Sequence, residues 1–114
     1  PLVFISIHCN SSQRSTAKGI KIYHYPNSTE GEKLARYIRQ SVDEHLYKDY
    51  MKQEYMRAEV LSEDFYILRE TDYVGVLVEI GFLTNPEEKM LLQEEEYQRQ
   101  IARAIKKGIL KYLE

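Results

Sequence analysis

Two short apolar segments constrain the fold of this chain more than any other feature of its sequence. Residues 2–7 are apolar except for Ser6, and residues 74–80 are apolar except for Glu79. Both segments are short and rich in β-branched residues, which favours strands buried on both faces, as in a parallel sheet. Helical patterns separate them along the chain. The sequence therefore predicts an α/β fold with a mostly parallel or mixed sheet flanked by helices.

Shorter patterns indicate further elements in the first two thirds of the chain. Apolar and polar residues alternate over residues 19–25, which predicts another strand. Thr29 and Glu32 have the spacing of a capping box, and apolar residues then recur at helical spacing to about residue 50. A short strand is expected at residues 65–68.

The last third of the chain carries clear helix signals. Asn85 is a typical N-cap residue and Pro86 suits the first helical position. A final helix is expected over residues 94–113, with Gly108 allowing close packing against a neighbour. Residues 51–64 are polar and mixed, and we expect a lid or a variable segment there.

Length and composition describe one domain or part of one. The 114 residues have a net charge of −2 without a basic stripe, so no nucleic-acid partner is expected. No apolar run approaches the length of a membrane span. The chain opens within a strand pattern and has no signal-peptide features, which indicates a sheet that is incomplete at its N-terminal side. We therefore expect residues 1–114 to be the C-terminal portion of a single domain.

Each of the two apolar segments delivers an ionisable residue close to its end. His8 directly follows the first segment, and Glu79 lies near the end of the other. If the strands are parallel neighbours, the two side chains meet at the same edge of the sheet, where α/β proteins bind ligands. A carboxylate among apolar residues is costly to bury without a partner or a metal ion. The alternatives remain a structural histidine and a glutamate at a sheet edge that faces water.

The only cysteine, Cys9, offers a different chemistry. It could act as a nucleophile with His8 or His24 as its base, although it is predicted to be a small buried residue. His24 and His45 are expected to be packing residues. The sequence contains no HExxH motif, no CxxC pair and no glycine-rich phosphate loop.

Two motifs in this order resemble one known family. Residues 4–10, FISIHCN, resemble the SIHxN motif of the zinc-dependent N-acetylmuramoyl-L-alanine amidases of the family 3 type. Residues 76–88, VLVEIGFLTNPEE, resemble the second signature of that family, a buried strand with a glutamate followed by GFxxNxxE. The resemblance continues through the strand at residues 19–25, the helix that follows it and the closing helix, so it covers nearly the whole chain.

This resemblance implies a specific activity. Members of the family hydrolyse the amide bond between N-acetylmuramic acid and L-alanine in peptidoglycan, in the extracellular space or cell envelope. They use one zinc ion, and by position His8 matches a zinc-binding histidine while Glu79 matches the catalytic glutamate. The family's other zinc ligands, one histidine and one glutamate, lie earlier in the domain and have no match here.

Three expectations follow from this departure from the family pattern. Residues 1–114 alone are expected to be inactive or nearly so, because one imidazole cannot hold zinc tightly. A missing strand would leave an exposed sheet edge that favours self-association. The alternative to an enzyme is a non-catalytic module of the same fold that binds cell wall or another partner.

Overall fold

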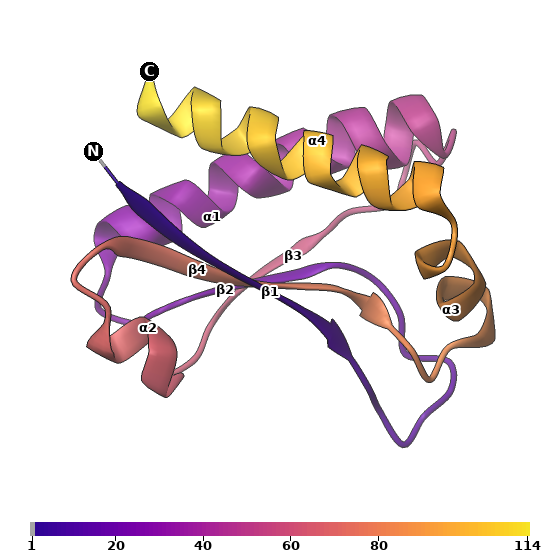
Figure 1. Cartoon of the computed structure of the whole chain (residues 1–114), viewed down its shortest axis with the longest axis horizontal. Helices are drawn as coiled ribbons and strands as arrows, with labels where there is room; N and C mark the ends of the chain where they lie inside the picture. The colour runs from indigo at the N-terminus through magenta and orange to yellow at the C-terminus, as the bar shows by residue number, and fades with distance from the viewer. Residues whose placement is uncertain (1) are drawn as a thin grey trace.

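A computed structural model describes residues 2–114 and shows a mixed sheet with helices (Figure 1). Pro1 lies outside the described residues. The elements are β1 (Val3–Asn10), β2 (Lys21–His24), α1 (Thr29–Ser41), the π-helix η1 (Val42–Tyr50), β3 (Glu59–Ser62), α2 (Tyr66–Glu70), β4 (Val74–Phe82), α3 (Pro86–Leu92) and α4 (Glu95–Leu113). The four strands form one sheet in the order β1-β4-β2-β3. Strand β4 is parallel to β1 and antiparallel to β2, and β2 is parallel to β3. The predicted α/β fold with a mixed sheet is confirmed.

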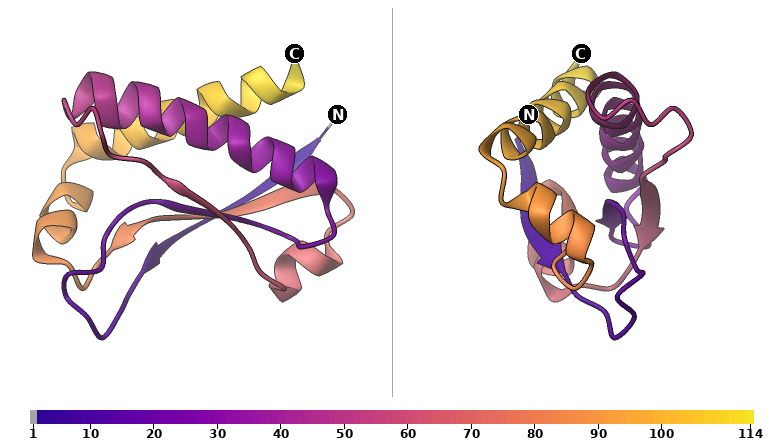
Figure 2. Two further views of the ribbon diagram at one scale, coloured as in Figure 1. Left: turned by 180° about the vertical axis from the view of Figure 1, so that it is seen from behind. Right: turned by 90° about the vertical axis from the view of Figure 1, so that its right-hand side faces the viewer.

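The long helices cover one face of the sheet. Helices α1 and α4 lie side by side on this face, with η1 continuing α1 (Figures 1 and 2). Ile22, Val76 and Val78 point into the core beneath these helices and are fully buried. Side chains alternate between the two faces of a strand, so Lys21, Leu77 and Glu79 belong to the opposite face.

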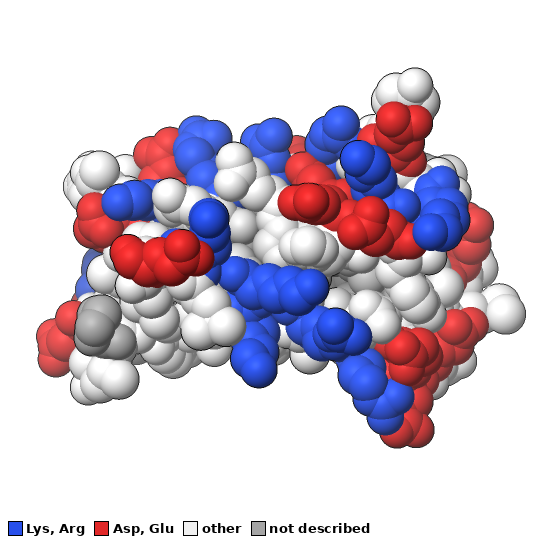
Figure 3. All heavy atoms as spheres, turned by 90° about the horizontal axis from the view of Figure 1, so that it is seen from above, with Lys and Arg blue, Asp and Glu red and all other residues white. Residues whose placement is uncertain are grey.

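The two long helices approach closely at one glycine. A Cβ atom at Gly108 of α4 would lie 2.6 Å from the Cα atom of Ile38 on α1. Nearby, the Ser41 hydroxyl donates a hydrogen bond to the backbone carbonyl of Ala104. The predicted close packing at Gly108 is confirmed. On the outer surface of this helix layer, Lys and Arg are interspersed with Asp and Glu (Figure 3).

The first strand is longer and more exposed than predicted. It extends to Asn10, so it includes His8 instead of ending before it. The expectation that it is buried on both faces is wrong: the residues of β1 are half-buried or exposed, and among the described strands β1 pairs only with β4 at the edge of the sheet. Val3 and Ile5 pack against the core, while Ile7 is 53% exposed.

Three local predictions also need correction. Residues 65–68 do not form a strand; Tyr66–Glu70 is the short helix α2, which buries Leu68. The strand β3 lies at Glu59–Ser62, within the segment where a lid or a variable segment was expected. It pairs in parallel with β2, which is distant in sequence. The N-cap of α1 is Ser28 instead of Thr29, since the Ser28 hydroxyl accepts the N–H of Gly31 at 2.9 Å.

Candidate active site

The face of the sheet opposite α1 and α4 carries a row of ionisable side chains. His8 is the register partner of Glu79 across the parallel pair β1–β4. Glu79 is also opposite Lys21 on β2, and Lys21 is opposite Glu59 on β3. Register partners on adjacent strands share a face, so the four side chains form one row across all four strands. The predicted meeting of His8 and Glu79 at one part of the sheet is confirmed.

Glu79 is held in an unusual state for a carboxylate. Its Oε2 atom is shielded from solvent and has no hydrogen-bond partner among residues 2–114. Desolvation by burial raises the pKa of Glu79 above its ordinary value, and the charge of His8 offsets part of this rise. The ammonium of the neighbouring Lys21 pairs with Glu59 at 2.7 Å and does not bond to this oxygen. The shielded Oε2 atom is therefore available to accept a hydrogen bond.

A hydroxyl on the same strand orients the His8 imidazole. Ser6 and His8 are two residues apart on β1, so both side chains lie on the same face. The Ser6 Oγ atom is 2.7 Å from His8 Nε2, within hydrogen-bonding distance. A hydrogen bond to one ring nitrogen fixes the orientation of the ring and leaves the other nitrogen for a ligand.

The other predicted chemical residues do not join this pair. Cys9 is exposed, so its predicted burial is wrong; it lies in the exposed second half of the edge strand β1, together with Ile7 and His8. His24 is buried on the helix-covered side of β2, with its Nδ1 atom 3.0 Å from the carbonyl oxygen of Tyr25. A Cys9–His24 pair is therefore not formed. His45 lies in η1, 3.8 Å from Asp49, and is not part of the row.

Glu88 is the last residue of the GFxxNxxE motif, and the sequence alone assigned it no role beyond a helix start. It is 9% exposed and lies on α3, close to the end of β4. Its carboxylate accepts backbone N–H groups from Phe82 and Gly19, each at 2.9 Å. The NPEE sequence identifies Glu88 as part of a helix start, but only the tertiary structure shows that its side chain reaches two other segments.

No complete metal-binding set is formed by the residues that the structure describes, since no three His, Cys, Asp or Glu side chains within 2–114 converge on one point. The His8–Glu79 pair nevertheless has the chemistry of one part of a metal site. It provides one oriented imidazole and one shielded carboxylate oxygen without a partner. Catalytic zinc uses histidine and carboxylate ligands, with a bound water next to a carboxylate base.

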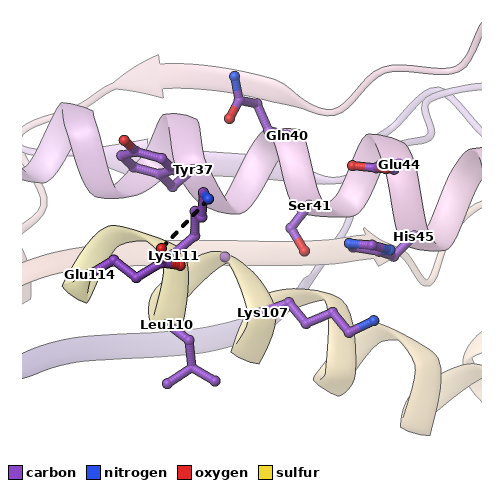
Figure 4. Close-up of a pocket in the computed structure, with 10 residues that line it drawn as sticks. Tyr37, Gln40, Ser41, Glu44, His45, Lys107, Leu110, Lys111 and Glu114 are labelled. Atoms are coloured by element: carbon purple, nitrogen blue, oxygen red, sulfur yellow. Dashed lines mark ion pairs between the residues drawn. The ribbon is translucent and has the colours of Figure 1, made fainter.

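A cavity of about 390 Å³ lies elsewhere, between α1 and α4 (Figure 4). Tyr37, Gln40, Ser41 and His45 line one wall, and Lys111 on the other wall pairs with Glu114 at 3.7 Å. The sheet separates this helix layer from the row that contains Glu79. The cavity therefore does not contribute to the candidate active site.

Fold and site together define a class: a mixed α/β domain with a histidine and a shielded carboxylate in register on the face opposite its long helices. The chain belongs to the N-acetylmuramoyl-L-alanine amidase family, whose pattern matches residues 1–111.

Individual relatives agree with this assignment. The germination-specific N-acetylmuramoyl-L-alanine amidase of Bacillus subtilis is 33% identical over 110 residues, covering 96% of this chain and 44% of the relative. The CwlD amidase of Clostridioides difficile, solved in complex with the GerS lipoprotein, is 32% identical with a TM-score of 0.87; the match covers 97% of this chain and 54% of CwlD. The amidase AmiC2 of Nostoc punctiforme is 34% identical with a TM-score of 0.83, covering 97% and 57%. The chain thus spans about half the length of these relatives.

Proposed function

We propose that the protein containing this chain hydrolyses the amide bond between N-acetylmuramic acid and L-alanine in peptidoglycan. The observation that carries the proposal is the in-register pair of His8 and Glu79, in which the Glu79 Oε2 atom is shielded and has no partner among residues 2–114. Membership of the amidase family supports the choice of substrate. A relative from Staphylococcus epidermidis is named a probable cell wall amidase, which supports an extracellular or cell-envelope location.

In this proposal His8 is one ligand of a single zinc ion, and Glu79 is the general base. When bound, zinc polarises the scissile carbonyl and lowers the pKa of a water molecule. Glu79 takes the proton of the attacking water and delivers it to the leaving nitrogen. Its raised pKa favours this role, because a carboxylate with a pKa closer to neutral is a stronger base. Ser6 keeps the imidazole oriented toward the metal position.

We further propose that the other zinc ligands come from outside residues 1–114, so that these residues form the C-terminal portion of one catalytic domain. Two observations support this: no three metal-binding side chains converge within residues 2–114, and the chain spans about half the length of its relatives. Residues 1–114 alone would then bind zinc weakly and show little or no activity.

The exposed edge of β1 supports a separate proposal of self-association by the isolated chain. Within the described sheet β1 pairs on one side only, and Ile7 is 53% exposed beside it. Unpaired edges favour pairing with another chain.

Among the described residues, no helix has the length and apolar character required to cross a membrane.

A zinc titration by calorimetry tests the metal site. The natural-length protein is expected to bind one zinc ion, and His8→Ala is expected to weaken this binding by at least about tenfold. His45→Ala is the matched control, because His45 lies in η1 and contacts Asp49. Equal zinc affinity of His8→Ala and wild type would exclude His8 as a ligand.

The second candidate function is a non-catalytic cell-wall-binding module, favoured by the incomplete set of metal-binding residues within 2–114. It predicts that the natural-length protein binds no zinc and still sediments with purified peptidoglycan. Stoichiometric zinc binding would reject this candidate.

A further inference from the structure

The ladder between β2 and β4 stops at the residue proposed as the base. Lys21 and Glu79 are the last register pair of this antiparallel ladder. Beyond it, the chain enters β2 through Gly19 and leaves β4 through Gly81 and Phe82. On its other side β4 stays paired with β1 as far as Phe82, which is the register partner of Asn10. On the side of β2 no register pair follows, and a strand end without further pairing frays readily. The position of Glu79 relative to β2 therefore depends on what holds these two strands together beyond this pair.

The carboxylate of Glu88 provides that connection. Its Oε2 atom accepts the N–H of Gly19, and its Oε1 atom accepts the N–H of Phe82, both at 2.9 Å. One side chain thus binds the segment before β2 and the end of β4 at the same time. A carboxylate that accepts backbone N–H groups forms charge-assisted hydrogen bonds, which are stronger than neutral ones.

This arrangement differs from an ordinary helix cap. In a capping box, the glutamate at the third helical position returns to the N–H of the N-cap residue. Here the N-cap is Asn85, whose side chain accepts the Glu88 N–H at 3.1 Å while its own N–H donates to the carbonyl of Phe82. The Glu88 carboxylate consequently does not cap its own helix and instead accepts the N–H groups of Gly19 and Phe82.

Gly81 makes the close approach of this carboxylate possible. Its φ angle is +153°, and an added Cβ atom would lie 3.3 Å from Glu88 Oε1 and 3.2 Å from the Leu92 Cδ1 atom. The same turn is also bound to the strand of His8, because the Leu83 N–H donates to the Asn10 carbonyl at 2.9 Å. The turn after β4 therefore contacts the ends of both strands that carry the candidate site.

We propose that Glu88 is a positioning residue that fixes Glu79 relative to His8 by joining the end of β4 to the start of β2. The inference rests on the proposed amidase function for its kinetic consequence. Glu88 does not contact the reacting atoms in this account; it acts through the backbone of Phe82 and Gly19.

Kinetics of Glu88→Gln provide the first test, in the zinc-loaded protein at its natural length with a muramoyl-peptide substrate. Glutamine keeps the size of the side chain but has one carbonyl oxygen, so one of the two N–H groups faces an amide NH₂ group instead of an acceptor. We expect kcat to fall by about 10- to 100-fold, because small displacements of a catalytic group are costly. KM is expected to stay within about threefold, since substrate-binding groups are unchanged.

Two controls separate positioning from loss of stability. Glu87→Gln changes the neighbouring glutamate of α3, which is exposed, and should leave kcat unchanged. Ile101→Val on α4 loosens the buried core on the other side of the sheet and lowers the unfolding temperature without touching Glu88. A loss of kcat in Glu88→Gln beyond that of Ile101→Val, measured well below both unfolding temperatures, supports the proposal. Equal kcat values in wild type and Glu88→Gln would overturn it and leave the amidase function standing.

Amide hydrogen exchange of the metal-free protein tests the connection between Gly19 and Phe82 through Glu88, and it does not depend on enzymatic activity. In Glu88→Gln, the amides of Gly19, Phe82 and Glu79 are expected to exchange at least about tenfold faster, because the ladder loses its outer connection. If the wild-type protein fails to cleave the substrate, the proposed function is wrong, and this measurement still decides the role of Glu88. Unchanged exchange at Glu79 would overturn the positioning role.

Discussion

Replacing Glu79 by glutamine should stabilise the metal-free chain while removing its proposed base. In the wild type, the Oε2 atom is shielded and has no partner among the described residues. Burial of a charged carboxylate oxygen without a partner costs on the order of 1–3 kcal/mol, and a neutral amide of the same shape avoids the part that is due to the charge. The side chain is only partly buried, so solvent screens part of this cost, and we expect a gain of about 1 kcal/mol. For a chain of this size, that corresponds to an increase in Tm of about 4 °C.

The pH dependence of this gain follows from the direction of the pKa shift. Burial raises the pKa of Glu79 in the folded state above its value in the unfolded state. Glu79 therefore contributes stability that is fully present below its pKa in the unfolded state. This contribution is lost as the pH rises through its pKa in the folded state. Glu79→Gln cannot ionise, so its advantage over wild type should be absent near pH 3 and complete near pH 8.

Urea denaturation of the metal-free chain at several pH values measures this difference in the free energy of unfolding. Glu87→Gln serves as the control, because it removes one negative charge from an exposed position on α3. The reasoning would be refuted if Glu79→Gln were less stable than wild type at pH 8, or if the difference between them did not change with pH.

Three further predictions concern other contacts. Ser6→Ala should weaken zinc binding by the natural-length protein about tenfold in a calorimetric titration, because the imidazole loses its orienting partner; an unchanged Kd would exclude that role. Gly108→Ala should lower the free energy of unfolding by about 1–3 kcal/mol in urea, since its Cβ atom would overlap the backbone of Ile38, and a gain in stability would contradict the observed packing. Tyr47→Phe should cost about 1–3 kcal/mol in the same assay, because it removes the hydroxyl that accepts the buried N–H of Ile20; no loss of stability would contradict this assignment.

The pairing of the candidate site could be predicted from the sequence because it depends on strand periodicity. Two apolar segments, each carrying an ionisable residue close to its end, predict parallel neighbours, and His8 and Glu79 are indeed in register. The same reasoning failed for the burial of Cys9, which lies in the exposed second half of the edge strand β1. Periodicity indicates which residues share a face of a strand and does not reveal how well that face is covered.

Contacts between distant segments could not be predicted in this way. Lys21 lies beside Glu79 only because β2 is antiparallel to β4, and the alternation in residues 19–25 is compatible with either direction. The reach of Glu88 to Gly19 joins residues 69 positions apart. Residues 65–68 were expected to be a strand because they are apolar and short, whereas helix formation there buries Leu68 and lets Phe65 contact the ring of Tyr23, with centroids 5.2 Å apart.

The most direct test of the central claim is the turnover of a muramoyl-L-alanine amide substrate by the zinc-loaded protein at its natural length, compared with its Glu79→Gln variant. General base catalysis contributes about 10²- to 10⁴-fold, so the account predicts a loss of kcat of that size. The variant should remain folded and retain its zinc, and chelation should abolish the wild-type activity until zinc is restored. Wild-type turnover by Glu79→Gln would contradict the assignment of Glu79 as the base.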